Sequence, residues 1–209
     1  GPTREATSTA LACRRAGGMS CMQMSVGSGS SGTSGSPGEA QARKARVSLF
    51  ALAEAGRLDE LKSALDAEPG RVNELHTVSM SSALMVAAGD GNLPMVNALL
   101  STKDIDVNLA NSEGITACHV AAANGRKKAL RALVERGADV NKQSNEGNTP
   151  LYWASFNGHE SMALLLLSLG VLAEIPGAEV QPEAIARFYG HTKLADYLRA
   201  VIDAGGYAA

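Results

Sequence analysis

The chain has 209 residues, of which 45% are hydrophobic and only 4% aromatic, and its formal net charge is −2. That length suits one domain, or one domain with an extension, and the charge by itself neither suggests nor excludes a nucleic-acid partner. The longest aliphatic run, residues 162–167, is far shorter than the ~20 residues of a membrane span, and three cysteines make no disulfide framework.

The first part of the chain differs in composition from the rest. Residues 27–38 are Gly, Ser, Thr and Pro only. None of these side chains buries enough apolar surface to offset the conformational entropy lost when the chain is ordered. Residues 1–46 carry six basic and two acidic side chains, a net charge of +4. The rest of the chain carries 13 basic and 19 acidic side chains, a net charge of −6. We therefore expect a flexible, basic N-terminal extension over residues 1–46, joined to an acidic domain.

Three interpretations of this extension remain open. Its Ala, Ser, Arg and Met content with few acids is typical of an organelle transit segment, which would place the protein in a plastid or another organelle rather than the cytoplasm. Because the chain does not begin with Met, Gly1 and Pro2 could instead be the scar of a cleavage. The third interpretation is a disordered leader, or an arm that a complex orders.

The remaining residues repeat at a regular interval. Glycines recur at intervals of 35, 34, 33 and 32 residues, at Gly56, Gly91, Gly125, Gly158 and Gly190. The spacing divides the domain, residues 47–203, into five units of approximately 47–76, 77–110, 111–143, 144–175 and 176–203. Residues 204–209 remain as a C-terminal tail.

Two of the units carry a recognisable motif. The fourth contains Gly-Asn-Thr-Pro-Leu-Tyr-Trp-Ala at residues 147–154, and the third contains Gly-Ile-Thr-Ala-Cys-His-Val-Ala at residues 114–121 and ends in Gly-Ala-Asp-Val-Asn at residues 137–141. With a period of ~33 residues, these stretches resemble the ankyrin repeat family. The resemblance implies an all-α solenoid of about five helix-turn-helix units, and it is most specific over residues 111–170.

The residue types within each unit fit that architecture. Thr116 and Thr149 stand where a hydroxyl can cap an inner helix, and Pro150 suits a first helical turn. Apolar residues then recur at helical spacing in each second helix: Met95, Val96, Leu99 and Leu100; Leu130, Leu133 and Val134; Met162, Leu165 and Leu166. The first and fifth units have charged residues at several apolar positions, as expected of the end caps of a solenoid.

No catalytic or metal-binding motif stands out. By the resemblance, His119 bonds the neighbouring loop, and His159 and His191 occupy structural positions after the repeat glycine. Cys118 is expected to be a small buried residue, and Cys13 and Cys21 do not have zinc-site spacing. We therefore expect no catalytic residue, no metal and no cofactor, and we interpret the basic cluster over residues 126–131 as a solvated helix face, because the domain's net charge disfavours nucleic acid.

The aromatic residues are unevenly placed. Seven of the eight follow residue 150, and only Phe50 precedes them. Trp153 occupies a position that the family packs, so we expect it to be buried. By the resemblance, the following residues face the concave groove or the loop tips, and we predict that they bind a partner: Phe156, Asn157, Phe188, Tyr189, Asn124, Asp90, Asn145, Glu146 and Glu113.

The function that these patterns favour is a non-catalytic protein–protein interaction module. It would bind a protein partner in a hetero-complex, as a stable subunit or scaffold of a larger, organellar assembly. The alternative is a soluble regulator of a partner enzyme such as a kinase, because the compact ankyrin proteins of four or five units include cyclin-dependent kinase inhibitors. An independent enzyme ranks last, for want of a motif.

Overall fold

The computed structural model describes residues 48–77, 79–175 and 180–205, and from Leu49 onward they form one compact unit. These residues contain ten α-helices, one 3₁₀ helix and no strand. The predicted extension over residues 1–46 lies outside the described residues. The helices are α3 (Leu49–Glu54), α4 (Leu58–Ala67), η1 (Pro69–Asn73), α5 (Ala83–Asp90), α6 (Leu93–Leu100), α7 (Ala117–Ala123), α8 (Lys127–Glu135), α9 (Pro150–Phe156), α10 (Glu160–Ser168), α11 (Pro182–Phe188) and α12 (Thr192–Asp203).

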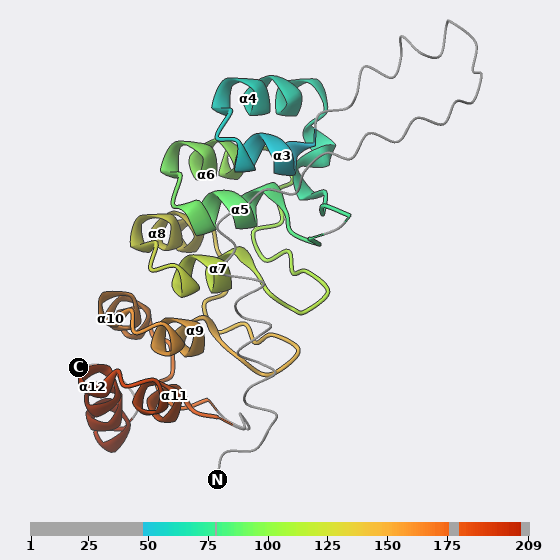
Figure 1. The fold of residues 1–209 in the computed structure, drawn as a ribbon. Helices are drawn as coiled ribbons and strands as arrows, with labels where there is room; N and C mark the ends of the chain where they lie inside the picture. Colours follow the sequence, from blue (N-terminus) through green and yellow to red (C-terminus); the bar gives the residue numbers. More distant parts are fainter. Residues whose placement is uncertain (1–47, 78, 176–179, 206–209) are drawn as a thin grey trace, which may run out of the picture. The chain divides into compact units, whose positions relative to one another are not determined.

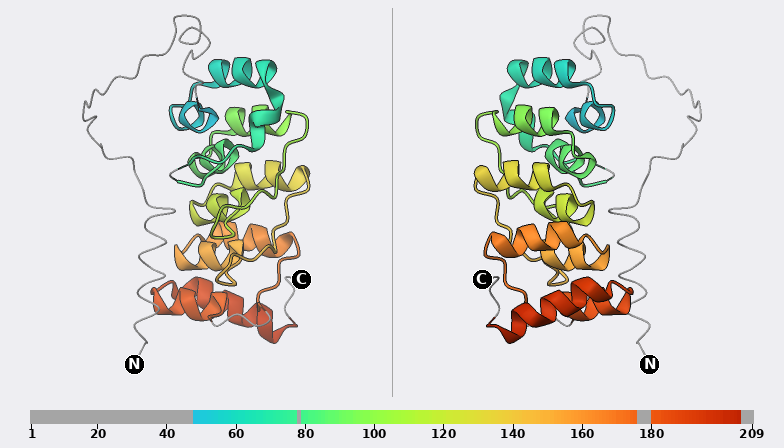
Figure 2. Two further views of the ribbon diagram at one scale, coloured as in Figure 1. Left: turned by 90° about the vertical axis from the view of Figure 1, so that its right-hand side faces the viewer. Right: turned by 90° about the vertical axis from the view of Figure 1, so that its left-hand side faces the viewer.

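The helices form five antiparallel pairs stacked in two layers (Figure 1). The inner helices α3, α5, α7, α9 and α11 each pack on the next one along the stack, and the outer helices α4, α6 and α8 do the same. Figure 2 shows the pairs one above another along the array. The fold is therefore the all-helical repeat solenoid that the glycine spacing predicts.

Capping residues begin the inner helices where the motif predicts. Ser82 Oγ accepts from the Met85 backbone N–H (3.2 Å), and Thr149 Oγ1 accepts from the Tyr152 N–H (3.4 Å). Pro150 occupies the first turn of α9, where its missing N–H leaves no helical bond unmade. Local sequence thus fixes where these helices start.

A glycine in the left-handed conformation separates the inner from the outer helix of each unit. Gly91, Gly125, Gly158 and Gly190 have φ values of 73°, 66°, 69° and 83°. Only glycine adopts such a conformation without strain. We call the line of these turns the turn edge; the longer loops that lead from one unit to the next, here called fingers, lie at the other end of the helices (Figure 1).

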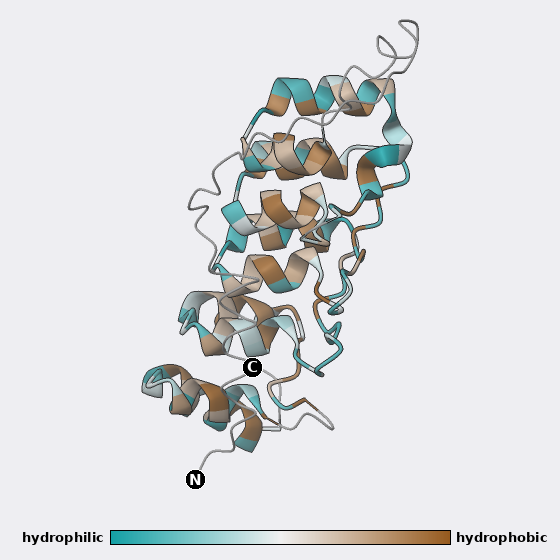
Figure 3. Cartoon of the chain, turned by 45° about the vertical axis from the view of Figure 1, so that its right-hand side comes forward, coloured by the Kyte–Doolittle hydropathy of each residue, from teal (hydrophilic) through white to brown (hydrophobic). Residues whose placement is uncertain are grey.

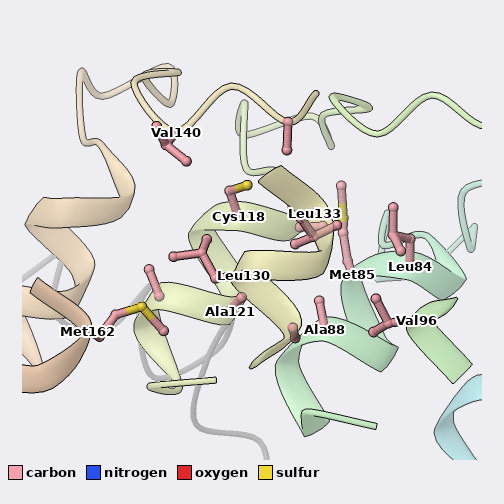
Figure 4. Close-up of a cluster of buried hydrophobic side chains, with 14 of the residues drawn as sticks. Leu84, Met85, Ala88, Val96, Cys118, Ala121, Leu130, Leu133, Val140 and Met162 are labelled. Carbon is pink, nitrogen blue, oxygen red and sulfur yellow. The ribbon is translucent and has the colours of Figure 1, made fainter. Parts of the chain in front are cut away.

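The core is continuous from unit to unit and is built almost entirely of aliphatic side chains. Small residues such as Ala88 and Ala121 are fully buried in the inner helices, where they allow close approach. Outer-helix leucines such as Leu130 and Leu133 fill the space between the layers, and Figure 4 shows residues of several units meeting there. In Figure 3 most helices accordingly show an apolar and a polar side.

Asparagine side chains join successive fingers. Asn73 Nδ2 donates to Asp104 O, and Asn73 Oδ1 accepts from the Asp106 N–H, both at 2.8 Å. One unit later, Asn108 Oδ1 accepts from the Asp139 N–H (2.8 Å), and its Nδ2 donates to the next finger's Gly137 O (3.3 Å). Each such asparagine couples its own unit to the following one.

The two ends of the array are polar, as expected of caps. In the last unit Arg187 on α11 pairs with Glu183 (2.9 Å) and with Asp196 of α12 (3.0 Å). In the first unit Arg57 pairs with Glu60. The Arg187–Glu183 pair thus stands where the fourth unit has two buried residues, because a terminal unit has a neighbour on one side only.

Candidate functional site

The C-terminal ends of the inner helices bring several predicted site residues to the turn edge. Asp90 ends α5, Asn124 caps α7, Phe156 and Asn157 end α9, and Phe188 ends α11. They occupy equivalent places in successive units, so they follow one another along the stack (Figure 1).

Four aromatic residues of the last two units touch one another in a row. The ring centroids lie 6.0 Å apart between Trp153 and Phe156, 4.4 Å between Phe156 and Tyr189, and 5.2 Å between Tyr189 and Phe188. The first and last of these pairs meet edge to face, as aromatic pairs often do, with planes at 65° and 72°, and the Phe156 and Tyr189 planes are tilted by 51°. We call these four residues the aromatic cluster.

Exposure increases along the aromatic cluster toward the end of the array. Trp153 is buried, as expected, Phe156 is half-buried, Tyr189 is 38% exposed and Phe188 is 63% exposed. The indole N–H of Trp153 is buried and has no hydrogen-bond partner among the described residues, so packing against these residues positions the ring. The cluster thus consists of a buried base and an exposed apolar tip.

The predicted asparagines serve the array itself. Asn124 Nδ2 donates to Gly89 O (3.2 Å), and Asn157 Nδ2 donates to Ala123 O (3.0 Å), in each case across to the preceding unit. At the fifth unit Tyr189 replaces this asparagine, and its ring contact with Phe156 replaces the hydrogen bond.

The remaining predicted residues lie on the fingers rather than the turn edge. Glu113, Asn145 and Glu146 are exposed. Asn145 Nδ2 donates to Ser112 O (2.8 Å), and Glu146 Oε2 accepts from Asn148 Nδ2 (3.2 Å). The structure therefore divides the nine predicted residues between two opposite edges, and only those at the turn edge lie near the aromatic cluster.

A second feature of the turn edge is basic. Arg126, Lys127 and Lys128, here called the basic turn, are exposed where α7 leads into α8. Arg126 Nε donates to Gly89 O (3.0 Å), just as His159 Nε2 donates to Ala123 O (2.9 Å) and His191 Nε2 to Phe156 O (3.2 Å). The sequence motif predicts structural roles for the two histidines but does not indicate that Arg126 takes the same role in the third unit.

The two titratable groups buried in the third unit are structural. His119 donates from Nε2 to Asn148 O (3.1 Å) and accepts at Nδ1 from the Thr116 N–H (3.1 Å), so it bonds the neighbouring loop as predicted. Burial lowers the pKa of His119 to about 4 and raises the pKa of the Cys118 thiol to about 12. Both groups are therefore neutral at neutral pH.

The described residues hold neither a metal site nor a membrane span. No group of three or more His, Cys, Asp or Glu side chains there is placed to hold a metal ion. None of the helices that the structure describes has the length and apolar character to cross a membrane.

Comparison with known proteins identifies the family. The family model for ankyrin repeats in three copies matches residues 49–144 and, in a second overlapping match, residues 84–176. Together the matches cover more than half of the chain. A search of curated proteins found no match. With the glycine turns, the His119 loop bond and the paired helices of the structure, the match shows that this chain belongs to the ankyrin repeat family.

Proposed function

We propose that this chain binds a partner protein through the aromatic cluster at the turn edge of its fourth and fifth units. Ankyrin repeats in general serve as protein-interaction modules, which supports binding as the type of function. The observation that carries this choice of surface is the exposure of the Phe188 ring, 63%, at the end of a row of touching rings.

The physical argument rests on rigidity as well as on apolar area. Tyr189 is held by Phe156 on one side and Phe188 on the other, and Phe156 rests on the buried Trp153. Aromatic side chains ordered before binding lose little further entropy when a partner covers them. Such residues are enriched among those that dominate the binding energy of protein interfaces.

The test is capture of partners from cell extract, followed by affinity measurement with the purified partner. The double variant Phe156→Ala/Phe188→Ala is compared with wild type and with Leu164→Ala, a matched variant that truncates another exposed apolar side chain, 44% exposed, on α10. We expect the double variant to raise Kd at least about tenfold and Leu164→Ala to leave it unchanged. Equal affinity of all three proteins, with unaltered circular dichroism, would contradict the proposal.

The same preparation separates the two forms that binding could take. A subunit or scaffold of a larger assembly would co-purify with its partners at fixed stoichiometry. A regulator would instead change the turnover of a partner enzyme, such as a kinase, when added to it. Repeating the capture with a chain that begins at residue 47 tests whether the predicted extension contributes.

A further inference from the structure

The basic turn is a concentration of positive charge that its surroundings leave uncompensated. In the part of the chain that the structure describes, no ion pair joins Arg126, Lys127 or Lys128 to a carboxylate. Lys127 and Lys128 also lie in the first turn of α8, where the helix dipole disfavours positive charge.

No carboxylate of the neighbouring units pairs with this charge among the described residues. Helix α6 of the second unit contains no charged residue, and neither Asp90 at the end of α5 nor Glu160 at the start of α10 forms an ion pair with the basic turn. From residue 47 onward the chain carries a net charge of −6. The basic turn is therefore a local positive site on an acidic domain.

Hydrogen bonds along the turn edge place the basic turn next to the aromatic cluster. Asn157 and His159 of the fourth unit both donate to Ala123 O, at 3.0 and 2.9 Å, and Ala123 lies three residues before Arg126 of the basic turn. His191 of the fifth unit donates in turn to Phe156 O at 3.2 Å. The turns of the third, fourth and fifth units thus follow one another along one edge (Figure 1).

The repeat spacing sets the distance that a partner must span. Packed helices lie ~8–10 Å apart, and an extended chain advances ~3.3 Å per residue. One unit therefore corresponds to about three residues of an extended partner. The basic turn is one to two units away from the aromatic cluster, or about three to six partner residues.

We propose that the partner presents an extended acidic segment, with one or two carboxylates about three to six residues from a large apolar side chain. The apolar side chain packs on Phe188 and Tyr189, and the carboxylates pair with Lys127 and Lys128. This proposal rests on the proposed function, because it needs the aromatic cluster as the anchor. A polyanionic nucleic acid fits less well, because the net charge of the domain repels it and the cluster offers no charge to its phosphates.

The experiment selects ligands from a phage-displayed library of random peptides about 12 residues long, enough to span the three units, with the full chain as bait. We expect enrichment of sequences with Asp or Glu about three to six positions from Leu, Ile, Phe or Trp. For a synthetic peptide of that pattern, Lys127→Glu/Lys128→Glu should raise Kd at least about tenfold. The same peptide with its acids replaced by Lys should bind that variant better than it binds wild type.

The control variants separate the failure of this proposal from that of the proposed function. Lys62→Glu, a reversal at an exposed lysine of α4, should leave Kd unchanged. Selected peptides that lack acidic residues would contradict the proposal of an acidic segment. So would a Lys127→Glu/Lys128→Glu variant that binds as Lys62→Glu does while Phe156→Ala/Phe188→Ala abolishes binding. In that case the aromatic cluster is still the binding surface. Peptide binding that survives Phe156→Ala/Phe188→Ala contradicts the anchor itself.

Two further outcomes also overturn the acidic segment. The first is a library selection that enriches no sequence. The second is a single-stranded RNA oligonucleotide that binds more tightly than any selected peptide and loses affinity in Lys127→Glu/Lys128→Glu, which would assign the basic turn to nucleic acid.

Discussion

His119 links two units through a single buried imidazole. Its Nε2–H donates to Asn148 O of the next unit, which leaves Nδ1 as the acceptor for the Thr116 N–H. A proton added at Nδ1 would face that N–H donor inside a nearly dry site, so burial lowers the pKa of His119 to about 4. The neutral tautomer is therefore part of the fold.

This residue gives the stability of the array a pH dependence. Its pKa lies below the ordinary 6.5 in the folded state, so the unfolded chain binds more protons between pH 6.5 and about 4. Above pH 6.5 His119 makes its full contribution to the free energy of unfolding. That free energy decreases as the pH falls toward and below 4, by about 3 kcal/mol in total. Urea unfolding at a series of pH values measures it.

The comparison that isolates His119 uses His119→Gln, whose amide does not titrate. Carboxylates affect both proteins alike, so the difference in unfolding free energy between wild type and variant should shrink as the pH falls from 6.5 to 4. Parallel pH profiles would show that His119 protonation does not limit stability.

At the level of the helix pair, glycines in the left-handed conformation are needed for two separate reasons, shown by Gly158 at the turn edge and Gly170 after α10. Gly158 has a φ of +69°, and a Cβ added there would overlap the ring of His191, whose Nε2 donates to Phe156 O. Gly170 has a φ of +82°, but a Cβ added there would meet no atom within 4 Å. An added Cβ therefore causes backbone strain alone at Gly170, and backbone strain together with a steric clash at Gly158.

We predict different losses of stability from alanine at these glycines. Gly170→Ala should lower the unfolding free energy by about 1 kcal/mol, the strain of a left-handed residue with a Cβ. Gly158→Ala should lower it by at least about 2 kcal/mol, because the His191 ring must also move. Chemical denaturation measures both values. In a His191→Ala background the cost of Gly158→Ala should fall to that of Gly170→Ala, and an unchanged cost would exclude the collision.

Over the whole array, the units differ in how firmly they are joined. Asn73 and Asn108 couple the first three units through the fingers. Among the described residues, no corresponding hydrogen bond joins Asn141 to the fourth finger, where Leu172 stands in the place of Asp139. The fifth unit is held by packing of α11 on α9 and by the His191 bond.

This difference predicts a gradient of local stability. Each unit of a solenoid contacts only its neighbours, so a terminal unit opens more readily than a central one. Native-state hydrogen exchange should give α12 amides a lower opening free energy than those of α7 and α9. The same opening free energy in all three helices would show that the array unfolds as one cooperative block.

Much of this protein follows from local sequence. The glycine interval predicts the five paired helices, since a left-handed turn needs glycine wherever it recurs. Thr116 and Thr149 predict where two inner helices begin, because a threonine hydroxyl can cap the first helical turn. The buried positions of Leu130, Leu133 and Met162 follow from helical periodicity.

The surface was decided only by the tertiary structure. Phe156 and Phe188 occupy equivalent positions of successive inner helices, yet Phe156 is half-buried and Phe188 is 63% exposed, because exposure depends on which unit lies beside each ring. Asn124 and Asn157 have the composition of a binding site, but a carbonyl of the preceding unit takes up each amide. Periodicity determines which residues reach the turn edge, and contacts between units more than 30 residues apart determine which of them remain free for a partner.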